Sequence, residues 1–327
     1  RCEHDEVAAV AAETEEIAAR ALELVAVEYE DLPGVFTPED GAREGAPQIH
    51  DNFAGNRSLA FEFQHGDLAA AEAASDFVVD NVFRPHHVTH CCMGTSCAIA
   101  DFDHNGKLTI WTQTQYPYNY KMDLAPALGM DPGDIRVIQP PVGGAFGSKL
   151  DVYPYEPIAA LLARKTGRPV KVTYTRPEEF RASPTRQAAI IHMRTGCTRE
   201  GVLTFRSADV LLDNGAYTSW GPTIPVIMMR TTSGHYRVPV VAFKAQAIYT
   251  NNPYAGSFRG YGNVQTTWAT AQQMDMLADL VDLEPLAFHL KNAQASGEVT
   301  PQELARENSP FAGLVGAVDF TRTGLPK

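Results

Sequence analysis

The chain has 327 residues, of which 44% are hydrophobic and 20% charged, a composition typical of a globular protein with a large core and about two domains. Its formal net charge of −12 and its lack of a Lys/Arg-rich run disfavour binding to nucleic acid or to an anionic membrane, because both demand a basic surface. No stretch approaches the roughly 18 consecutive apolar residues of a membrane helix, and the five cysteines, an odd and sparse set, fit a reducing compartment better than a disulfide scaffold.

The N-terminal segment carries a β-α-β pattern. Val7–Ala11 and Val25–Tyr29 are short apolar runs with the pattern of strands. Between them, Thr14 is placed to cap a helix whose first turn carries two glutamates, where carboxylates favour the helix dipole. The chain starts without an initiator Met and without the apolar core of a signal peptide, so we expect a clipped or partial chain.

Residues 36–68 are rich in Gly, Asn, Pro and charge without sustained periodicity, so we expect a connector there, with a domain boundary near Asn52–Glu62. Two helices are expected further on, at Pro157–Lys165 and at Thr266–Leu280. Apolar runs predict strands at Phe77–Phe83, Ala98–Phe102, Leu108–Thr114, Ile135–Ile138, Val170–Thr175, Ala188–Thr195, Ser207–Asp213 and Phe243–Tyr249. Many strands with fewer helices predict a mixed fold.

Two glycine-rich segments are the strongest candidates for a binding site. Gly143–Lys149 (Gly-Gly-Ala-Phe-Gly-Ser-Lys) lies between an expected strand and an expected helix, and its glycines let backbone N–H groups approach an anion or a flat cofactor. Its spacing is not that of a phosphate-binding loop, and a plain tight turn is the alternative. Ala255–Gly262 holds Arg259 among small residues, where its planar fork suits an oxyanion or a phosphate; an exposed surface turn is the alternative there.

Other polar side chains are weaker candidates. Gln115 ends a strand with an amide that can donate to a metal-oxo group or merely fix a loop. One short stretch contains His86, His87, His90, Cys91, Cys92 and Cys97. Zinc prefers two ligand pairs and an iron–sulfur cluster four cysteines, and no second pair is present in this sequence. We therefore expect no metal ligated directly by side chains, and a strand and turn with buried thiols.

Together these segments resemble the molybdenum hydroxylases of the xanthine dehydrogenase and aldehyde oxidase type. The landmarks, in the order of that family, are Thr114-Gln115, Gly143–Lys149, Asp213–Tyr217 and Phe258–Gly262. The resemblance implies an α+β fold in which residues 1–50 are a partial α/β hammerhead domain with its connector. Residues 51–327 would be the first molybdopterin-binding domain, a mixed α/β unit.

The resemblance also implies a role for each site residue. Gln115 and Arg259 would act beside the metal, Gln115 through a hydrogen bond to its oxo ligand or to the pterin. Together with these two, the cofactor would be bound by Gly143, Gly144, Ala145, Phe146, Gly147 and Gly260. The substrate would contact Tyr261, Arg186 and Leu150.

The chain departs from the family pattern at three points. Leu150 stands where purine-oxidising members carry a glutamate, which argues against xanthine and for a more apolar or carboxylate-bearing ring. Gly94 and Thr95 stand where relatives have an acidic residue and a proline. The family's catalytic glutamate, in a glycine-rich motif far downstream, has no counterpart before Lys327. The second half of the site is therefore expected on another chain, or this chain is truncated.

The run Thr250–Gly262 is most similar to the split nicotinate dehydrogenase type, and the 4-hydroxybenzoyl-CoA reductase alpha chain is also similar. The implied function is the molybdopterin-binding subunit of a cytoplasmic, heteromeric hydroxylase that inserts a water-derived oxygen into an electron-poor ring carbon of a nicotinate-like substrate. The implied cofactor is molybdopterin, in its cytosine dinucleotide form, with molybdenum. The implied partners are a second molybdopterin-binding chain, an iron–sulfur subunit and an FAD subunit.

Three alternatives stay open at this point. The first is an aromatic acyl-CoA reductase that removes a ring hydroxyl, and the second is a binding paralogue without cofactor. The third is an unrelated α/β enzyme that holds a nucleotide in its glycine loop.

Overall fold

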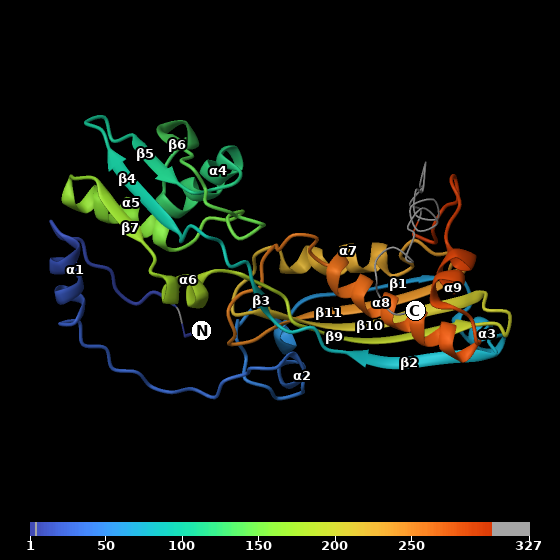
Figure 1. The fold of residues 1–327 in the computed structure, drawn as a ribbon. Coiled ribbons are helices and arrows are strands. Elements are labelled where there is room, and N and C mark those ends of the chain that lie inside the picture. The colour runs from blue at the N-terminus through green and yellow to red at the C-terminus, as the bar shows by residue number, and fades with distance from the viewer. Residues whose placement is uncertain (4, 303–327) are drawn as a thin grey trace.

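The structure, a computed structural model, describes residues 1–3 and 5–302 and forms two lobes (Figure 1). The larger lobe is built on a five-stranded sheet in the order β1-β11-β10-β9-β2. Its strands are β1 (Arg57–His65), β2 (Phe77–Phe83), β9 (Ala189–Cys197), β10 (Leu203–Gly215) and β11 (Val240–Tyr249). The β10–β11 pair runs parallel and the other three pairs run antiparallel.

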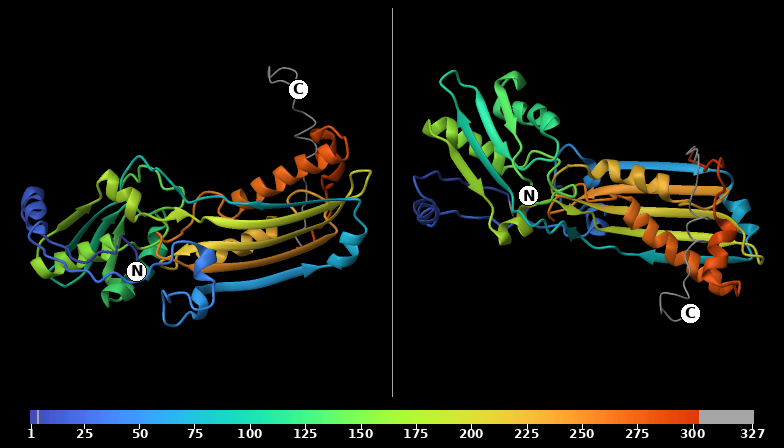
Figure 2. Two further views of the ribbon diagram at one scale, coloured as in Figure 1. Left: turned by 90° about the horizontal axis from the view of Figure 1, so that it is seen from below. Right: turned by 45° about the horizontal axis from the view of Figure 1, so that its top comes forward.

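Helices cover one face of this sheet (Figure 2). They are α7 (Ile224–Thr231), α8 (Asn263–Leu280) and, beside α8, α9 (Pro285–Asn292). Alternate residues of β10, namely Ala208, Val210 and Leu212, are buried against these helices, whereas Asp209, which lies between the first two, is exposed. This alternation is the pattern of an antiparallel-type sheet that packs one face and leaves the other to water. No helix among the described residues has the length and apolar character needed to span a bilayer.

The smaller lobe has a four-stranded sheet in the order β6-β5-β4-β7, with two helices against one face. Its elements are β4 (Cys97–Phe102), β5 (Leu108–Thr112), β6 (Ile135–Ile138), β7 (Val170–Thr173), α4 (Pro117–Leu128) and α5 (Tyr155–Thr166). The core between sheet and helices includes the fully buried Ile110, Leu124 and Ala159. Gly167 ends α5 in the left-handed conformation that glycine adopts without strain.

The smaller lobe is inserted between two neighbouring strands of the larger one. β2 leads into it and β9 returns from it, and the two strands pair with Phe83 opposite Ile191. The two crossing segments also pair, as β3 (Val88–Thr89) with β8 (Thr185–Arg186). The base of the smaller lobe is therefore held close to one end of the larger sheet. The remaining helices are α1 (Glu15–Leu22), α2 (Pro38–Gly41), α3 (Leu68–Ala73), α6 (Arg176–Ala182), η1 (Ala54–Asn56), η2 (Pro132–Asp134) and η3 (Gly221–Thr223).

The structure confirms the mixed α+β class, all strands expected after residue 70 and both expected helices. The strands expected at Val7–Ala11 and Val25–Tyr29 are wrong: only the helix between them forms, because no described segment pairs with either run. Residues 1–50 thus show helices but no strand of an α/β unit in the part that is described. The connector expected up to residue 68 is also wrong, since β1 lies within it as an edge strand whose alternating Leu59, Phe61 and Phe63 pack on the core.

Candidate cofactor-binding site

The loop Gly143–Lys149 leaves β6 and leads toward α5, as the sequence indicates. Its glycines Gly143, Gly144 and Gly147 have φ of +69°, +100° and +107°, a region that other residues rarely adopt. Phe146 also has a positive φ, of +54°. Within residues 1–3 and 5–302, nothing accepts a hydrogen bond from the backbone N–H groups of Gly144, Ala145 or Phe146. Unpaired N–H groups on a loop with left-handed residues are the arrangement of an anion-binding nest.

Gln115 lies against this loop. Its backbone N–H donates to the carbonyl of Lys149 at 2.9 Å, and its side-chain Oε1 accepts from the N–H of Gly147 at 3.1 Å. The side chain is exposed, and its Nε2 has no acceptor among the described residues. Gln115 thus fixes the loop through its oxygen and keeps its amide donor available.

The second glycine segment meets the first directly. The backbone N–H of Arg259 donates to the carbonyl of Phe146 at 2.8 Å, and the Arg259 guanidinium lies 5.2 Å from the centre of the Phe146 ring. At Gly147, a Cβ atom would lie 2.4 Å from the carbonyl oxygen of Ser257, closer than atoms tolerate. Gly147 is therefore required for the close approach of the two segments. The contact brings Gln115, Phe146 and Arg259 together, as the sequence predicts.

Arg186 lies behind the second segment. Its guanidinium stacks 4.4 Å from the centre of the Phe258 ring and donates to the carbonyl of Arg259 at 2.8 Å and to Gln265 Oε1 at 3.3 Å. His90 also packs on Phe258, with ring centres 4.2 Å apart, and His90 Nε2 donates to the Ser257 carbonyl at 2.7 Å. Burial lowers the pKa of both Arg186 and His90. These contacts support the backbone around Arg259; whether Arg186 also contacts a substrate stays a prediction.

Tyr261 lies within the second glycine segment, and Leu150 directly follows the first. The Tyr261 ring meets Trp220 edge-on, with ring centres 6.5 Å apart. Ser219, next to Trp220, donates a hydrogen bond to the carboxylate of Asp151, next to Leu150. Burial raises the pKa of Asp151. Asp151 was not singled out by sequence because nothing in its neighbourhood marks an isolated aspartate.

Lys149 is a second residue whose position the sequence does not reveal. Its side chain is only 2% exposed, and its ammonium donates to the carbonyls of Gly94 and Val142, at 3.2 and 2.8 Å, and to Gln113 Oε1 at 3.1 Å. Burial lowers its pKa. Gly94 also donates from its N–H to the carbonyl of Gly143 at 3.0 Å. A Cβ at position 94 would lie 3.3 Å from both Gly143 Cα and the Val142 carbonyl oxygen, so this tight contact with the loop favours glycine there.

The described contacts of the stretch from His86 to Cys97 join it to neighbouring segments of the chain. His87 lies 3.1 Å from the carboxylate of Asp213, which also accepts from Thr250 Oγ1 at 2.6 Å and from Asn252 Nδ2 at 2.6 Å. Burial would raise the pKa of Asp213, but hydrogen bonds, above all from His87, outweigh it and hold that pKa below its usual value. Cys92 is buried beneath the first loop, with Sγ 3.4 Å from Ser148 Oγ. No group of three or more His, Cys, Asp or Glu residues able to hold a metal occurs in residues 1–3 and 5–302.

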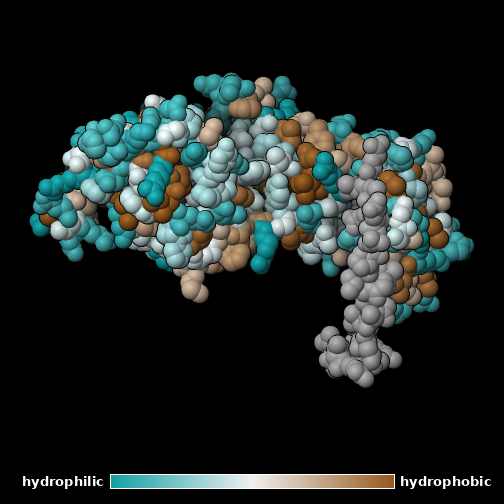
Figure 3. Space-filling view, turned by 90° about the horizontal axis from the view of Figure 1, so that it is seen from above, coloured by the Kyte–Doolittle hydropathy of each residue, from teal (hydrophilic) through white to brown (hydrophobic). Residues whose placement is uncertain are grey.

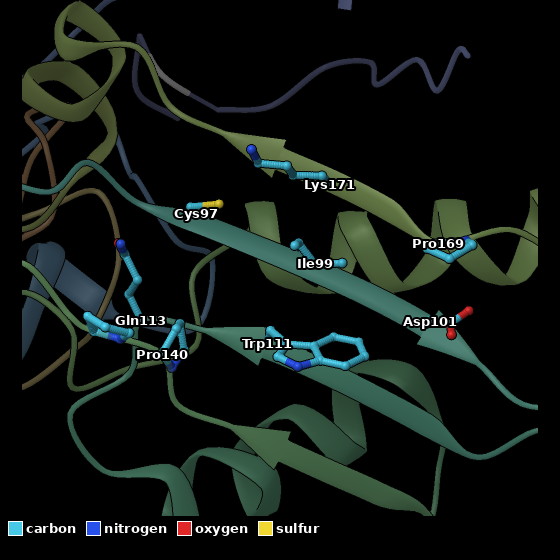
Figure 4. A pocket seen from close by; sticks show the side chains of 9 residues that line it. Cys97, Ile99, Asp101, Trp111, Gln113, Pro140, Pro169 and Lys171 are labelled. Carbon is cyan, nitrogen blue, oxygen red and sulfur yellow. The ribbon is translucent and has the colours of Figure 1, made fainter. Parts of the chain in front are cut away.

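A cavity of about 470 Å³ lies on the face of the small sheet that points away from α5 (Figure 4). It is lined by Cys97, Ile99, Asp101, Trp111, Gln113, Pro140, Pro141, Pro169 and Lys171. Gln115, Phe146 and Arg259 are not among these residues, so the contact between the two loops lies outside this cavity. Apolar side chains also reach the surface in separate patches on both lobes (Figure 3), and Phe146 is 44% exposed.

The chain matches known proteins over most of its length. The family model of the molybdopterin cofactor-binding domain matches residues 49–293. The chain is 36% identical over 299 residues to a probable xanthine dehydrogenase subunit of Bacillus subtilis, covering 91% of this chain and 40% of that protein. It is 33% identical over 318 residues to the nicotinate dehydrogenase large molybdopterin subunit of Eubacterium barkeri, covering 97% of this chain and 74% of that protein.

Solved structures of molybdenum-family relatives have the same fold as this chain. Aldehyde oxidoreductase from Desulfovibrio gigas superposes with a TM-score of 0.90 at 26% identity, over 93% of this chain and 34% of that one. Quinoline 2-oxidoreductase from Pseudomonas putida superposes with a TM-score of 0.88 at 28% identity, over 93% of this chain and 40% of that one. The chain thus spans well under half the length of these two structures and of the Bacillus subtilis relative.

Proposed function

Because the chain belongs to the molybdopterin cofactor-binding domain family, with molybdenum-dependent dehydrogenase subunits as its relatives, we propose that it forms one half of a hydroxylase centre for N-heteroaromatic substrates. In this proposal the two glycine segments hold molybdopterin and its molybdenum between them. The observation that carries it is the direct contact of Phe146 with Arg259 beside Gln115. That contact joins segments more than a hundred positions apart in the sequence.

The residues present fit such a cofactor. Its oxo ligand and its pterin carbonyl accept hydrogen bonds, and the loops offer the unpaired N–H groups of Gly144, Ala145 and Phe146 with the Nε2 donor of Gln115. Arg259 adds a cation that no described carboxylate neutralises. When bound, the cofactor supplies Lewis acidity and an electron sink. Donors that are fixed before the reaction stabilise developing charge without reorganising.

The substrate side of the proposal rests on two residues. In this proposal Leu150, an apolar residue in place of a glutamate, faces the substrate ring, and Tyr261 supplies an aromatic ring that suits stacking or edge contacts with a planar ring. Two relatives carry the names nicotinate dehydrogenase and quinoline 2-oxidoreductase, which also point to nitrogen-containing rings. We therefore propose a nicotinate-like substrate.

The chemistry also requires parts that we place outside these 327 residues. A base glutamate and the rest of the pterin surface would come from a second molybdopterin-binding chain or from a longer form of this one, and electrons would leave through iron–sulfur and FAD subunits. We further propose the cytosine dinucleotide form of the cofactor. We also propose a reducing, cytoplasmic setting, which the five free cysteines support.

The test is to purify the complex through a tag on this chain and to measure molybdenum, pterin and the masses of co-purifying chains. We expect molybdenum and pterin in equal amounts, stoichiometric with the chain, together with partner subunits. A complex free of both molybdenum and pterin, or one that holds a simple nucleotide instead, would overturn the proposal.

A further inference from the structure

Glu156 is a carboxylate in an unusual place. It lies in the first turn of α5, is 2% exposed, and is surrounded by the apolar core of the smaller lobe. No Lys, Arg or His among the described residues forms an ion pair with it. Burying a carboxylate without a cation is costly, so core packing alone does not account for a glutamate at this position.

Its hydrogen bonds connect two parts of the candidate site. Thr112 Oγ1 donates to Oε1, and the backbone N–H of Tyr153 donates to Oε2 at 2.8 Å. Thr112 is the last residue of β5, three positions before Gln115. Tyr153 follows the Gly143–Lys149 loop by four positions. A single carboxylate thus joins the strand that carries Gln115 to the chain that leaves the glycine loop.

A third part of the site reaches the same core through aromatic contacts. The Tyr153 ring lies 6.0 Å from that of Tyr254, centre to centre, and Tyr254 packs against the core of the smaller lobe. Tyr254 stands five positions before Arg259, just ahead of the second glycine segment. Glu156 fixes the backbone of Tyr153, and Tyr153 in turn contacts the stretch of chain that leads to Arg259.

We propose that Glu156 is a positioning residue that sets the spacing of Gln115, the Gly143–Lys149 loop and Arg259, so that together they bind the cofactor. This inference rests on the proposed function. An apolar side chain would fill the same volume, but only a side chain with two hydrogen-bonding ends joins Thr112 to Tyr153. Burial raises the pKa of Glu156 to about 7, although hydrogen bonds from Thr112, the Tyr153 backbone, Tyr120 and Tyr155 oppose this shift, because the protein interior disfavours the charged carboxylate.

The experiment compares variants of the purified complex by molybdenum content per chain and by melting temperature. Glu156→Leu keeps the volume and loses both bonds, and Thr112→Val removes one donor with little change of shape. Glu156→Gln is the rescue variant, because its amide oxygen can accept from one of the two partners while the amide nitrogen faces the other, and the Thr112 hydroxyl can accept as well as donate. Leu124→Ala is the control, since Leu124 is equally buried in this core and touches neither bond.

We expect Glu156→Leu to lower molybdenum content about ten-fold, as loss of a supporting contact around a metal site typically does. Thr112→Val should also lower the molybdenum content, and Glu156→Gln should keep a molybdenum content within about two-fold of the parent. Leu124→Ala should lose melting temperature but keep its molybdenum. Losses in Glu156→Leu and Thr112→Val no larger than in Leu124→Ala, or a loss in Glu156→Gln as large as in Glu156→Leu, overturn the positioning role. A parent complex without molybdenum would instead overturn the proposed function itself.

Discussion

The free energy of unfolding should depend on pH through Glu156. In the folded chain burial raises the pKa of this carboxyl to about 7, against an ordinary value of 4.5. A raised pKa means that the folded chain binds the proton more tightly than the unfolded chain. Its stabilising effect is therefore full below pH 4.5, is lost as the pH rises toward 7, and changes no further above that. The difference, 7 − 4.5, corresponds to about 3 kcal/mol, since each pH unit is worth about 1.4 kcal/mol.

Glu156→Gln removes this dependence, because an amide stays neutral and can form both hydrogen bonds. The free energy of unfolding of the variant should match that of the parent chain near about pH 4 and should exceed it near about pH 8 by up to about 3 kcal/mol. Denaturant unfolding, followed by circular dichroism at both pH values, measures the difference. Glu62→Gln is the control, because the Glu62 side chain is 72% exposed and its removal should leave the pH profile unchanged. Parallel profiles for the parent and Glu156→Gln would refute a carboxyl that titrates near neutral pH.

Three further outcomes are expected. Gly147→Ala should prevent the two loops from packing together, because the added Cβ would lie 2.4 Å from the Ser257 carbonyl oxygen. Gly106→Ala is the control, since Gly106 also has a positive φ but has open space around it. Chemical denaturation of that variant should show a loss of only about 1–2 kcal/mol in the free energy of unfolding. Gln115→Ala and Arg259→Ala should each lower turnover or molybdenum content of the complex; full activity and full metal in both variants would contradict their roles. Asp213→Ala should cost about 3 kcal/mol at about pH 7, because its buried donors lose their acceptor. The pKa of Asp213 is lower in the folded chain than in the unfolded chain, so the difference in unfolding free energy between parent and variant should shrink as the pH falls below the unfolded-state pKa. A difference that grows at low pH would contradict this.

Much of the site could be predicted from the sequence because its chemistry depends on backbone geometry. Glycines at positive φ leave a visible pattern, and Gly143–Lys149 and Ala255–Gly262 both have it. Their contact through Phe146 and Arg259 could not be predicted from spacing, since it depends on how one lobe is inserted in the other. The resemblance to a family supplied that information.

The residues that sequence reasoning missed share a physical reason. The missed residues are charged side chains in buried or half-buried positions, namely Lys149, Asp151 and Glu156. Nothing in a single sequence distinguishes a buried charged residue from an exposed one. Glu156 in particular resembles an ordinary acidic residue at the start of a helix, where carboxylates are common on the surface.

The strand errors have a different origin. Val7–Ala11 and Val25–Tyr29 have strand patterns, but a strand exists only where another chain segment completes its hydrogen bonds. β1 is not predicted although it does find a pairing partner in the sheet. Its polar residues face water at the edge of the sheet, and only the alternation of Leu59, Phe61 and Phe63 reveals it.

The nested arrangement of the lobes has a consequence for protein engineering. Phe83 and Ile191 face each other across adjacent strands, so a tight turn could replace everything between them and leave the larger sheet continuous. Such a shortened protein would keep Arg259 and Tyr261 but lose Gln115 and the first glycine loop. It would provide a background on which donor lobes from relatives could be transplanted, with each graft judged by whether it restores contact to Arg259.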